Sequence, residues 1–209
     1  MENSKCKICR RLGTKLFLRG ERCSSPKCAM IKKPYPPGPR AKKRRKNVSE
    51  YGKELKEKQK LKNWYNLEEK QFRRYVKETL KARARVADAG TALVKTLESR
   101  LDNVIFRLGF ASSRKAARQM VSHGHFTINN KSINIPSYLV RKDDQIKVKP
   151  ASIKKPIFQK LLPVLKKHNP PSWLKLDLQK MEAKVLDSPN MEEAVPPAEI
   201  TTIFEFYSK

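Results

Sequence analysis

Four cysteines lie within the first 28 residues of the chain and could together hold one metal ion. They form two close pairs, Cys6 with Cys9 and Cys23 with Cys28, and 13 residues separate the pairs. Thiolates in two such pairs suit a tetrahedral Zn2+ ion, because each pair forms one knuckle around the metal. We therefore predict one structural Zn2+ ion, which would supply the folding energy that so short a segment cannot obtain from an apolar core.

Two other chemistries are open to the same cysteines. Two disulfides would use all four thiols, although a reducing cytosol disfavours them. An iron–sulfur cluster also takes cysteine thiolates, so the spacing alone does not separate it from zinc. No histidine lies near these cysteines in the sequence, and a catalytic metal site is not expected.

A second candidate site is the start of a helix predicted after residue 112. Ser112 or Ser113 can cap this helix, and Arg114 and Lys115 lie in its first turn, where the helix dipole disfavours cations. Unpaired backbone N–H groups and added cations suit a phosphate group. Arg118, Gln119, Ser122 and His123 continue around the same end. The alternative is a solvated basic face.

These residues belong to a predicted helix–helix–sheet unit over residues 97–148. A helical apolar stripe runs from Leu97 to Leu108, with Thr96 as its cap and Gly109 as its end. After the second helix, strands are expected at residues 126–128 and 133–135, joined across 129–131, where asparagine tolerates positive φ. A third strand is expected at residues 145–148. This is a small α+β unit.

The composition indicates a partner rich in phosphate. The chain has 209 residues and a formal net charge of +28, and 38% of its residues are hydrophobic. Residues 1–50 hold 16 Lys and Arg against 3 acidic residues, whereas residues 151–209 hold 9 against 7. Such a basic excess is typical of nucleic-acid-binding proteins. No apolar run approaches the roughly 18 residues of a membrane span, and the N-terminus lacks a secretory signal. We expect a cytosolic protein without a membrane or small-molecule partner.

Residues 34–46 form an extended basic arm. Prolines at positions 34, 36, 37 and 39 favour a stiff, extended chain. Residues 40–46 then hold six cations in seven positions, a run that usually orders only on phosphates. A nuclear-import patch is the alternative interpretation.

Residues 51–86 are predicted to be helical, with a break near 63–66. Glu54 and Lys58 are spaced as an ion pair on an exposed helix, and Asn66 with Glu69 resembles a capping box. Beyond the break, apolar residues recur on one face, and the cations outside it are Arg73, Arg74, Lys77 and Lys81. We expect this face to be core. The apolar face comprises Phe72, Tyr75, Val76, Thr79 and Leu80.

The stretch LESRLDNVIFRLGFASSRKAARQMVSHGHFTINNKSINIPSYLV resembles the S4-type RNA-binding domain along nearly its whole length. In chain order, KKPYPPGP, YGKELKEKQKLKNWY, EEKQFRRYV, RLDNVIFRLGFA and a strand-like C-terminal IFEFYSK resemble the bacterial-type ribosomal protein S4 family. The resemblance covers essentially the whole chain. Asn66 stands where the family often has glycine, Pro39-Arg40 departs from the usual residues, and the four cysteines occur in only part of the family.

The resemblance implies a structural protein of the small ribosomal subunit that binds a helix junction in the 5′ domain of its RNA and nucleates assembly. It also implies neighbouring small-subunit proteins and messenger RNA near the entry channel as partners. The implied fold is α+β, with segments 1–46 (zinc knuckle and basic extension), 47–96 (helical), 97–150 (S4 domain) and 151–209 (packing back on the helical domain). The expected RNA-binding residues are Arg40, Lys43, Arg44, Arg45, Arg73, Arg100, Ser113, Arg114, Lys115, Arg118, Gln119, Ser122, His123, His125, Thr127, Asn129 and Lys131.

An enzyme is not expected. Arg100-Leu101-Asp102 is similar to the tripeptide that holds the catalytic aspartate of some pseudouridine synthases, but no segment is long enough for their separate catalytic domain. Asp102 is more simply explained by a role in ordering the first helix or by pairing with a neighbouring arginine. His123 and His125 flank a glycine without a nearby nucleophile. A free S4-domain regulator or ribosome-recycling factor is the alternative function.

Overall fold

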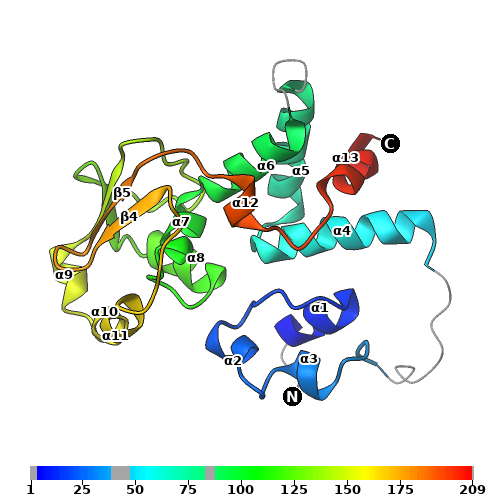
Figure 1. Ribbon diagram of the computed structural model, residues 1–209, viewed down its shortest axis with the longest axis horizontal. Helices are drawn as coiled ribbons and strands as arrows, with labels where there is room; N and C mark the ends of the chain where they lie inside the picture. The colour runs from blue at the N-terminus through cyan, green and yellow to red at the C-terminus, as the bar shows by residue number, and fades with distance from the viewer. Residues whose placement is uncertain (1–3, 39–47, 83–87, 209) are drawn as a thin grey trace. The chain divides into compact units, whose positions relative to one another are not determined.

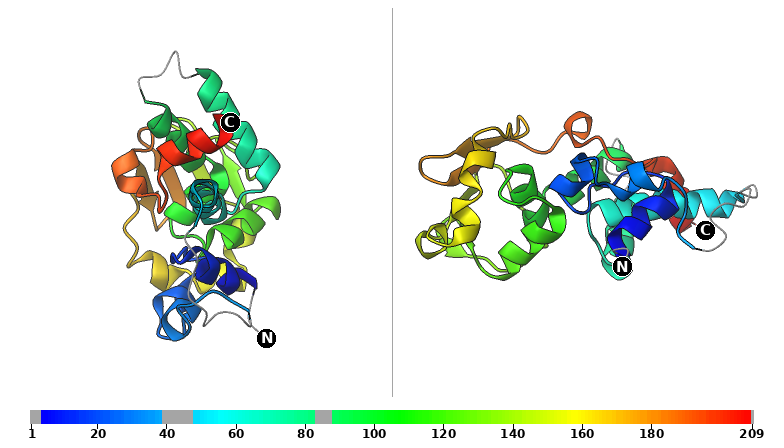
Figure 2. Two further views of the ribbon diagram at one scale, coloured as in Figure 1. Left: turned by 90° about the vertical axis from the view of Figure 1, so that its right-hand side faces the viewer. Right: turned by 90° about the horizontal axis from the view of Figure 1, so that it is seen from below.

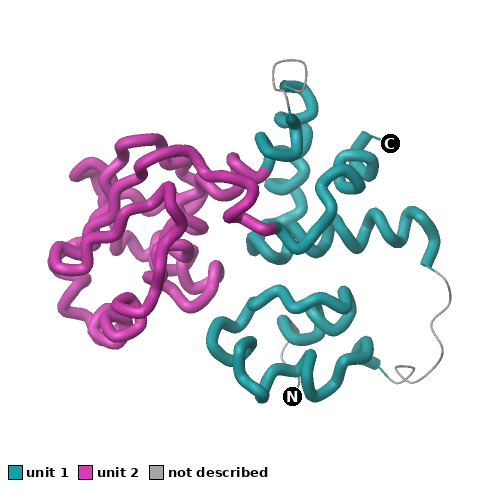
Figure 3. The backbone as a smooth tube through the Cα atoms, viewed as in Figure 1, with its two compact units in different colours: residues 1–93, 196–209 teal, residues 94–195 magenta. Residues whose placement is uncertain are grey.

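A computed structural model of the chain describes residues 4–38, 48–82 and 88–208. The chain divides into two compact units, one of residues 1–93 with 196–209 and one of residues 94–195 (Figure 3). Helices and one antiparallel sheet make up the described residues, which confirms the predicted α+β class. In the described ranges, no helix has both the length and the apolar character that a membrane crossing requires.

The first unit begins with the cysteine segment, which forms the short helices α1 (Ser4–Leu12), α2 (Glu21–Ser24) and α3 (Ala29–Lys32) (Figure 1). Arg10 is buried and ties this segment to the proline-rich stretch. Its Nε donates to the carbonyl oxygen of Tyr35 at 2.9 Å, and its guanidinium lies 4.9 Å from the centre of the Tyr35 ring. The rest of the predicted basic arm, residues 39–47, lies outside the described residues.

The helical part of the first unit holds α4 (Glu50–Trp64), α5 (Glu69–Ala82), α13 (Ile200–Ser208) and the beginning of α6 (Ala89–Glu98). Ser49 caps α4, because its side chain accepts a hydrogen bond from the backbone N–H of Gly52 at 3.3 Å. The predicted core face of α5 is confirmed by its burial pattern. Phe72, Tyr75, Val76 and Thr79 are buried, and Arg73 is exposed.

The turn between α4 and α5 differs from the prediction. Asn66 has φ +55° and ends α4 instead of capping α5. The backbone N–H of Leu67 donates to the carbonyl oxygen of Lys62 at 3.0 Å, the hydrogen bond of a Schellman ending. Asparagine takes this left-handed position at little steric cost, which explains why it can replace glycine there.

The prediction that Glu54 and Lys58 lie on an exposed helix face is wrong, because both residues are buried. Lys58 Nζ instead donates to Glu69 Oε1 on α5 at 2.7 Å and lies 4.8 Å from the centre of the Phe206 ring on α13. The helix α4 therefore uses this lysine to hold two other helices.

The strand predicted at the C-terminus is also wrong, because residues 200–208 form helix α13. In a helix, Ile203, Phe206 and Tyr207 are three or four residues apart and share a face. Ile203 is fully buried, and the Tyr207 hydroxyl donates to Glu69 Oε1 at 2.7 Å. The aromatic pattern that favours a strand locally is thus satisfied by packing against α4 and α5.

The second unit begins with a break in the predicted 97–108 helix. The chain leaves α6 at Glu98, and α7 runs from Leu101 to Arg107 with Arg100 as its N-cap, so Thr96 is not the cap. Arg100 instead forms a β-bridge with Leu139, and the backbone N–H of Leu101 donates to the carbonyl oxygen of Tyr138 at 2.8 Å. These long-range hydrogen bonds replace those of a continuous helix.

The other structural elements predicted for this region are found at the predicted positions, except for one strand. Gly109 ends α7 with φ +84°, and a Cβ there would lie 2.6 Å from the His168 ring. Helix α8 (Arg114–Ser122), β1 (Phe126–Ile128) and β3 (Gln145–Val148) match the prediction. The strand predicted at 133–135 is wrong: β2 is Lys131–Ser132, because the two-asparagine turn at 129–130 starts the pairing at once.

The sheet is larger than the sequence indicates. Its order is β2-β1-β3-β5-β4 with antiparallel pairing throughout, and β4 (Leu174–Asp177) and β5 (Glu182–Val185) come from the segment predicted to pack on the helical domain. Residues 151–195 therefore belong to the second unit, and residues 196–209 to the first. Short helices α9 (Pro150–Ile153), α10 (Pro156–Gln159) and α11 (Leu162–Leu165) precede β4, and α12 (Met191–Ala194) follows β5 (Figures 1 and 2).

One apolar core joins α7, α8 and the sheet. Each element contributes residues that are almost fully buried, so the helix pair is held at a fixed orientation to the strands. These residues include Leu101, Val104, Ile105, Ala117, Val121, Phe126, Ile146, Trp173 and Ala183.

Candidate nucleic-acid interface and cysteine cluster

The four cysteines lie around one small cavity. Cys6 and Cys9 come from α1, Cys23 from α2, and Cys28 from the residue before α3; all four line a space of about 10 Å3. None forms a disulfide, and all but Cys6 are buried. The backbone N–H of Arg19 lies 3.4 Å from Cys23 Sγ, a hydrogen bond to sulfur.

The electrostatics of the cluster oppose free thiolates. Burial raises the pKa of the Cys9 thiol; a backbone hydrogen bond from Leu16 opposes this, and the charges of the other three cysteines raise it further. A nearby positive charge would favour deprotonation of Cys9. Within residues 4–38, 48–82 and 88–208, no group of three or more His, Cys, Asp or Glu side chains is arranged to hold a metal ion.

The N-terminal end of α8 has Ser113 as its cap. The Ser113 hydroxyl accepts a hydrogen bond from the backbone N–H of Ala116 at 3.3 Å. Arg114 does not face outward as expected: it is 8% exposed, its Nε donates to Asn103 Oδ1 at 2.7 Å, and its guanidinium lies 4.6 Å from the Phe106 ring centre. Glu98 Oε1 lies 4.0 Å away. Arg114 therefore serves internal contacts in this structure.

Arg100 is also directed inward. It is 1% exposed and forms a two-pronged ion pair with Asp102, Nε to Oδ1 at 3.1 Å and Nη2 to Oδ2 at 2.6 Å. Burial raises the pKa of Asp102, and hydrogen bonds and charge from Arg100 oppose that rise. The predicted pairing of Asp102 with an arginine is confirmed.

An exposed polar set remains on α8. Lys115 and Gln119 lie on its surface, Ser122 and His123 are exposed at its C-terminal end, and Arg118 is half-buried. Among the described atoms, Arg118 Nη1 is buried without a hydrogen-bond partner. This exposed set offers donors to a ligand.

His125 is enclosed. Its Nδ1 lies 2.9 Å from Ser152 Oγ, and its ring stands edge-on to Phe158 at 5.7 Å. Burial lowers the pKa of His125, and the charges of Lys155, His123 and Lys149 lower it further. A neutral, enclosed imidazole is a poor phosphate ligand.

The first hairpin places its residues in three different settings. Thr127 is half-buried, and Lys131 is exposed. Asn129, with φ +48°, donates to Asp144 Oδ1 at 2.8 Å and accepts from the backbone N–H of Gln145 at 2.9 Å. Asn129 thus fixes the turn, although its side chain is also exposed.

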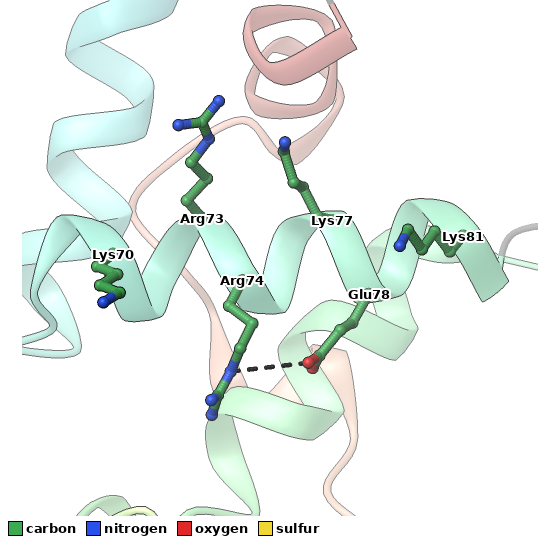
Figure 4. A pocket seen from close by; sticks show the side chains of 6 residues that line it. All are labelled: Lys70, Arg73, Arg74, Lys77, Glu78 and Lys81. Atoms are coloured by element: carbon green, nitrogen blue, oxygen red, sulfur yellow. Dashed lines mark ion pairs between the residues drawn. The ribbon is translucent and has the colours of Figure 1, made fainter.

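In the first unit, Arg73 lies on the exposed face of α5, within a row of cations (Figure 4). The sequence places Lys77 and Lys81 outside the apolar face together with Arg73, but the predicted RNA-binding set included only Arg73 from this helix and did not include Lys70. Their signal is the helical spacing of cations opposite the apolar face. The other predicted cations, Arg40, Lys43, Arg44 and Arg45, lie outside the described residues.

Two family models together match residues 1–146. The model described as "Ribosomal protein S4/S9 N-terminal domain" matches residues 1–98, and the "S4 domain" model matches residues 99–146. The second match contains α7, α8 and β1, and most of the predicted RNA-binding residues lie within it.

Curated relatives match nearly the whole chain. A protein of Caldicellulosiruptor saccharolyticus named "Small ribosomal subunit protein uS4" is 48% identical over 98% of this chain and 96% of its own length. Proteins of the same name from Thermus thermophilus and Syntrophomonas wolfei are 44% and 46% identical, covering 98% and 99% of this chain and 96% and 98% of their own lengths. The chain belongs to the ribosomal protein uS4 family.

Proposed function

We propose that this protein is a structural, non-enzymatic component of the small ribosomal subunit and binds small-subunit ribosomal RNA. This proposal rests on one observation: along nearly its whole length, the chain is 44–48% identical to proteins that are named for that subunit. The net charge of +28 supports a polyanionic partner. A role in the ribosome places the protein in the cytoplasm.

The finer proposal is a helix junction in the 5′ domain as the binding site, with neighbouring small-subunit proteins and the messenger entry channel close by. Phosphate contacts position a protein on RNA, whereas folded RNA is selected largely by its shape. The chain offers several surfaces for such selection: the cysteine segment, the cations of α5 and the exposed set on α8. We expect binding to nucleate assembly.

A competition titration at physiological salt tests this proposal, using junction RNA from the 5′ domain, duplex RNA of equal length and transfer RNA. The intact protein should prefer the junction by at least tenfold, about 1.4 kcal/mol. Equal affinities would leave only nonspecific charge attraction. The protein should also be present once per purified small subunit and survive a moderate salt wash, which a recycling factor would not.

The cysteine cluster is proposed to hold one structural Zn2+ ion. Three observations support this: the paired spacing, the common cavity lined by all four thiols, and the hydrogen bond to Cys23 sulfur. A divalent cation would offset the mutual repulsion of the four thiolates. Its chemistry would be structural: the ion would hold α1 beside the segment that carries Cys23 and Cys28.

Elemental analysis and X-ray absorption test the metal. One zinc per chain is expected, with four sulfur neighbours at about 2.3 Å. Cys9→Ser should lose the ion and raise proteolysis within residues 4–38. An iron absorption edge, or zinc with nitrogen and oxygen neighbours only, would contradict the zinc proposal without touching the RNA-binding one.

A further inference from the structure

We propose that the exposed stripe of helix α5 binds the sugar–phosphate backbone of double-stranded RNA and makes no contact with the bases. The stripe consists of Lys70, Arg73, Arg74, Lys77 and Lys81. It lies in the first unit and outside the S4 domain match. The inference rests on the proposed function, since it names how one surface of an RNA-binding protein holds its ligand.

The geometry of the stripe is that of one helix face. Four of its residues, at positions 70, 73, 77 and 81, are spaced by three or four and so lie above one another. They cover roughly 16 Å at 1.5 Å per residue. With Arg74 and Glu78 they line a hollow of about 420 Å3 (Figure 4).

The stripe is poorly neutralised within the protein. Among the described residues that line the hollow, the one acid is Glu78; it lies 3.6 Å from Arg74, and both side chains are 63% exposed. Across the described ranges, Lys70, Lys77 and Lys81 form no ion pair and no side-chain hydrogen bond. Like charges four residues apart, as Lys77 and Lys81 are, destabilise a helix. An anionic ligand would remove that cost.

Helix α4 of the same unit shows the contrast. Lys60 pairs with Glu57 at 2.6 Å, and Lys58 and Lys62 both pair with Glu69 at 2.7 and 3.0 Å. These lysines are half-buried or buried, whereas the lysines of α5 are exposed. These three cations of α4 thus serve the fold, and the lysines of α5 are left for a partner.

The stripe has no aromatic side chain that could stack on bases. The aromatic residues of α5, Phe72 and Tyr75, are buried on the opposite face. Sequence-specific recognition of single-stranded RNA depends on stacking of unpaired bases on aromatic or arginine planes, and A-form duplexes are recognised chiefly through backbone and shape. A row dominated by lysines, which act as point charges, therefore suits the phosphates of a duplex.

The test compares two double variants of the full chain. Lys77→Gln with Lys81→Gln removes two charges from the stripe and keeps good helix formers. Lys175→Gln with Lys180→Gln removes two exposed charges from the second unit as a matched control. The probe is a duplex RNA of about 20 base pairs, whose affinity is measured over a series of salt concentrations.

We expect the α5 variant to lose about tenfold in duplex affinity at physiological salt and its log–log salt slope to become shallower by about two. The control should change affinity less than twofold. Lys77→Arg with Lys81→Arg should retain wild-type affinity, and removal of like charges should not lower the melting temperature. Equal losses in the α5 variant and the control would overturn the inference.

Two further arms sharpen the result. Exchanging base pairs within the duplex should leave the α5 effect unchanged; an effect that depends on sequence would overturn backbone-only binding. A single strand of equal length should show a smaller loss, and an equal or larger loss would overturn the preference for duplex. Failure of the wild-type protein to prefer junction RNA would reject the proposed function. The comparison between the α5 variant and its control would still test duplex binding by α5.

Discussion

Basic residues in two regions of this protein differ in whether they are buried or exposed. At the beginning of the S4 domain, Arg100 and Arg114 are turned inward and are 1% and 8% exposed. On α5 of the other unit, Lys77 and Lys81 point to solvent. The two regions look alike in sequence, since both place clustered cations on a helix that also has an apolar face.

The difference comes from buried carboxylates. Asp102 and Glu98 are 4% and 1% exposed, and a carboxylate at such a position needs a partner of opposite charge. Arg100 and Arg114 supply that charge, together with Arg107, which pairs with Glu98 at 2.9 Å. Among the described residues that line the hollow on α5, only Glu78 is acidic, and it is exposed. Inward cations should therefore determine stability, and outward cations the salt dependence of RNA binding.

The largest effect is expected for Arg100→Ala. It leaves Asp102 buried without its two-pronged partner, and breaking a buried ion pair from one side costs about 3–5 kcal/mol. Urea unfolding at neutral pH measures the loss. The salt slope for duplex RNA should not change.

The double variant Arg100→Leu with Asp102→Leu separates charge from packing. Replacing both partners by apolar residues is often close to neutral, so this variant should recover most of the lost stability. If the double variant were as unstable as Arg100→Ala, the side-chain volume of Arg100 and not the ion pair would explain the loss.

A smaller loss is expected for Arg114→Ala, about 1.5–3 kcal/mol, because hydrogen bonds to charged groups are in that range. The change removes the donor to Asn103 and the contact with Phe106, while Glu98 keeps Arg107. Lys115→Ala is the matched control, since Lys115 is its exposed neighbour. The control should leave stability within about 0.5 kcal/mol of wild type. Equal stabilities of the two variants would show that Arg114 does not hold the fold.

In these regions the sequence predicts the secondary structure better than it predicts whether a charged side chain is buried or exposed. Helix α8 with its Ser113 cap, strands β1 and β3, and the buried face of α5 follow from capping, turn and periodicity signals. Each of those signals lies within a few residues of the element that it predicts.

The failures all depend on residues far away in the chain. The break at Arg100 is fixed by hydrogen bonds to residues 138–139, the C-terminal helix by packing on α4 and α5, and β4 with β5 by pairing across the sheet. The inward turn of Arg114 depends on Asn103, Phe106 and Glu98 in the same way. Helical spacing indicates which face of a helix carries a cation, but not whether a buried carboxylate of another segment lies within reach of that cation.

A pH-dependent effect of intermediate size is expected at Glu69. Burial alone raises the pKa of Glu69, but hydrogen bonds from Lys58, Tyr207 and Lys62 outweigh burial and lower it to about 2. A carboxyl whose folded pKa is depressed stabilises the fold above its unfolded pKa, near 4.5, and loses that contribution as the pH falls toward 2. Because the side chain is 45% exposed, we expect about 1 kcal/mol after screening.

Thermal unfolding between pH 7 and pH 2.5 measures this contribution by comparison with Glu69→Gln. The difference in stability between the two proteins should be present at pH 7 and should shrink below about pH 4.5, the range over which the unfolded carboxyl takes up its proton. A difference that is constant with pH would show that the amide fails for steric reasons and that the charge of Glu69 contributes nothing.

The smallest effect on stability, and the opposite effect on binding, is expected for Glu78→Gln. The Glu78–Arg74 pair is exposed, and such pairs at i,i+4 contribute about 0.3–0.5 kcal/mol. Its removal frees Arg74 and takes the one negative charge from the stripe, so duplex RNA should bind about two- to threefold more tightly at low salt. Glu192→Gln, which removes an exposed acid from α12, should leave affinity unchanged. A gain of equal size in both variants would mean that net charge alone controls RNA binding, and the distinction between inward and outward cations would then apply only to stability.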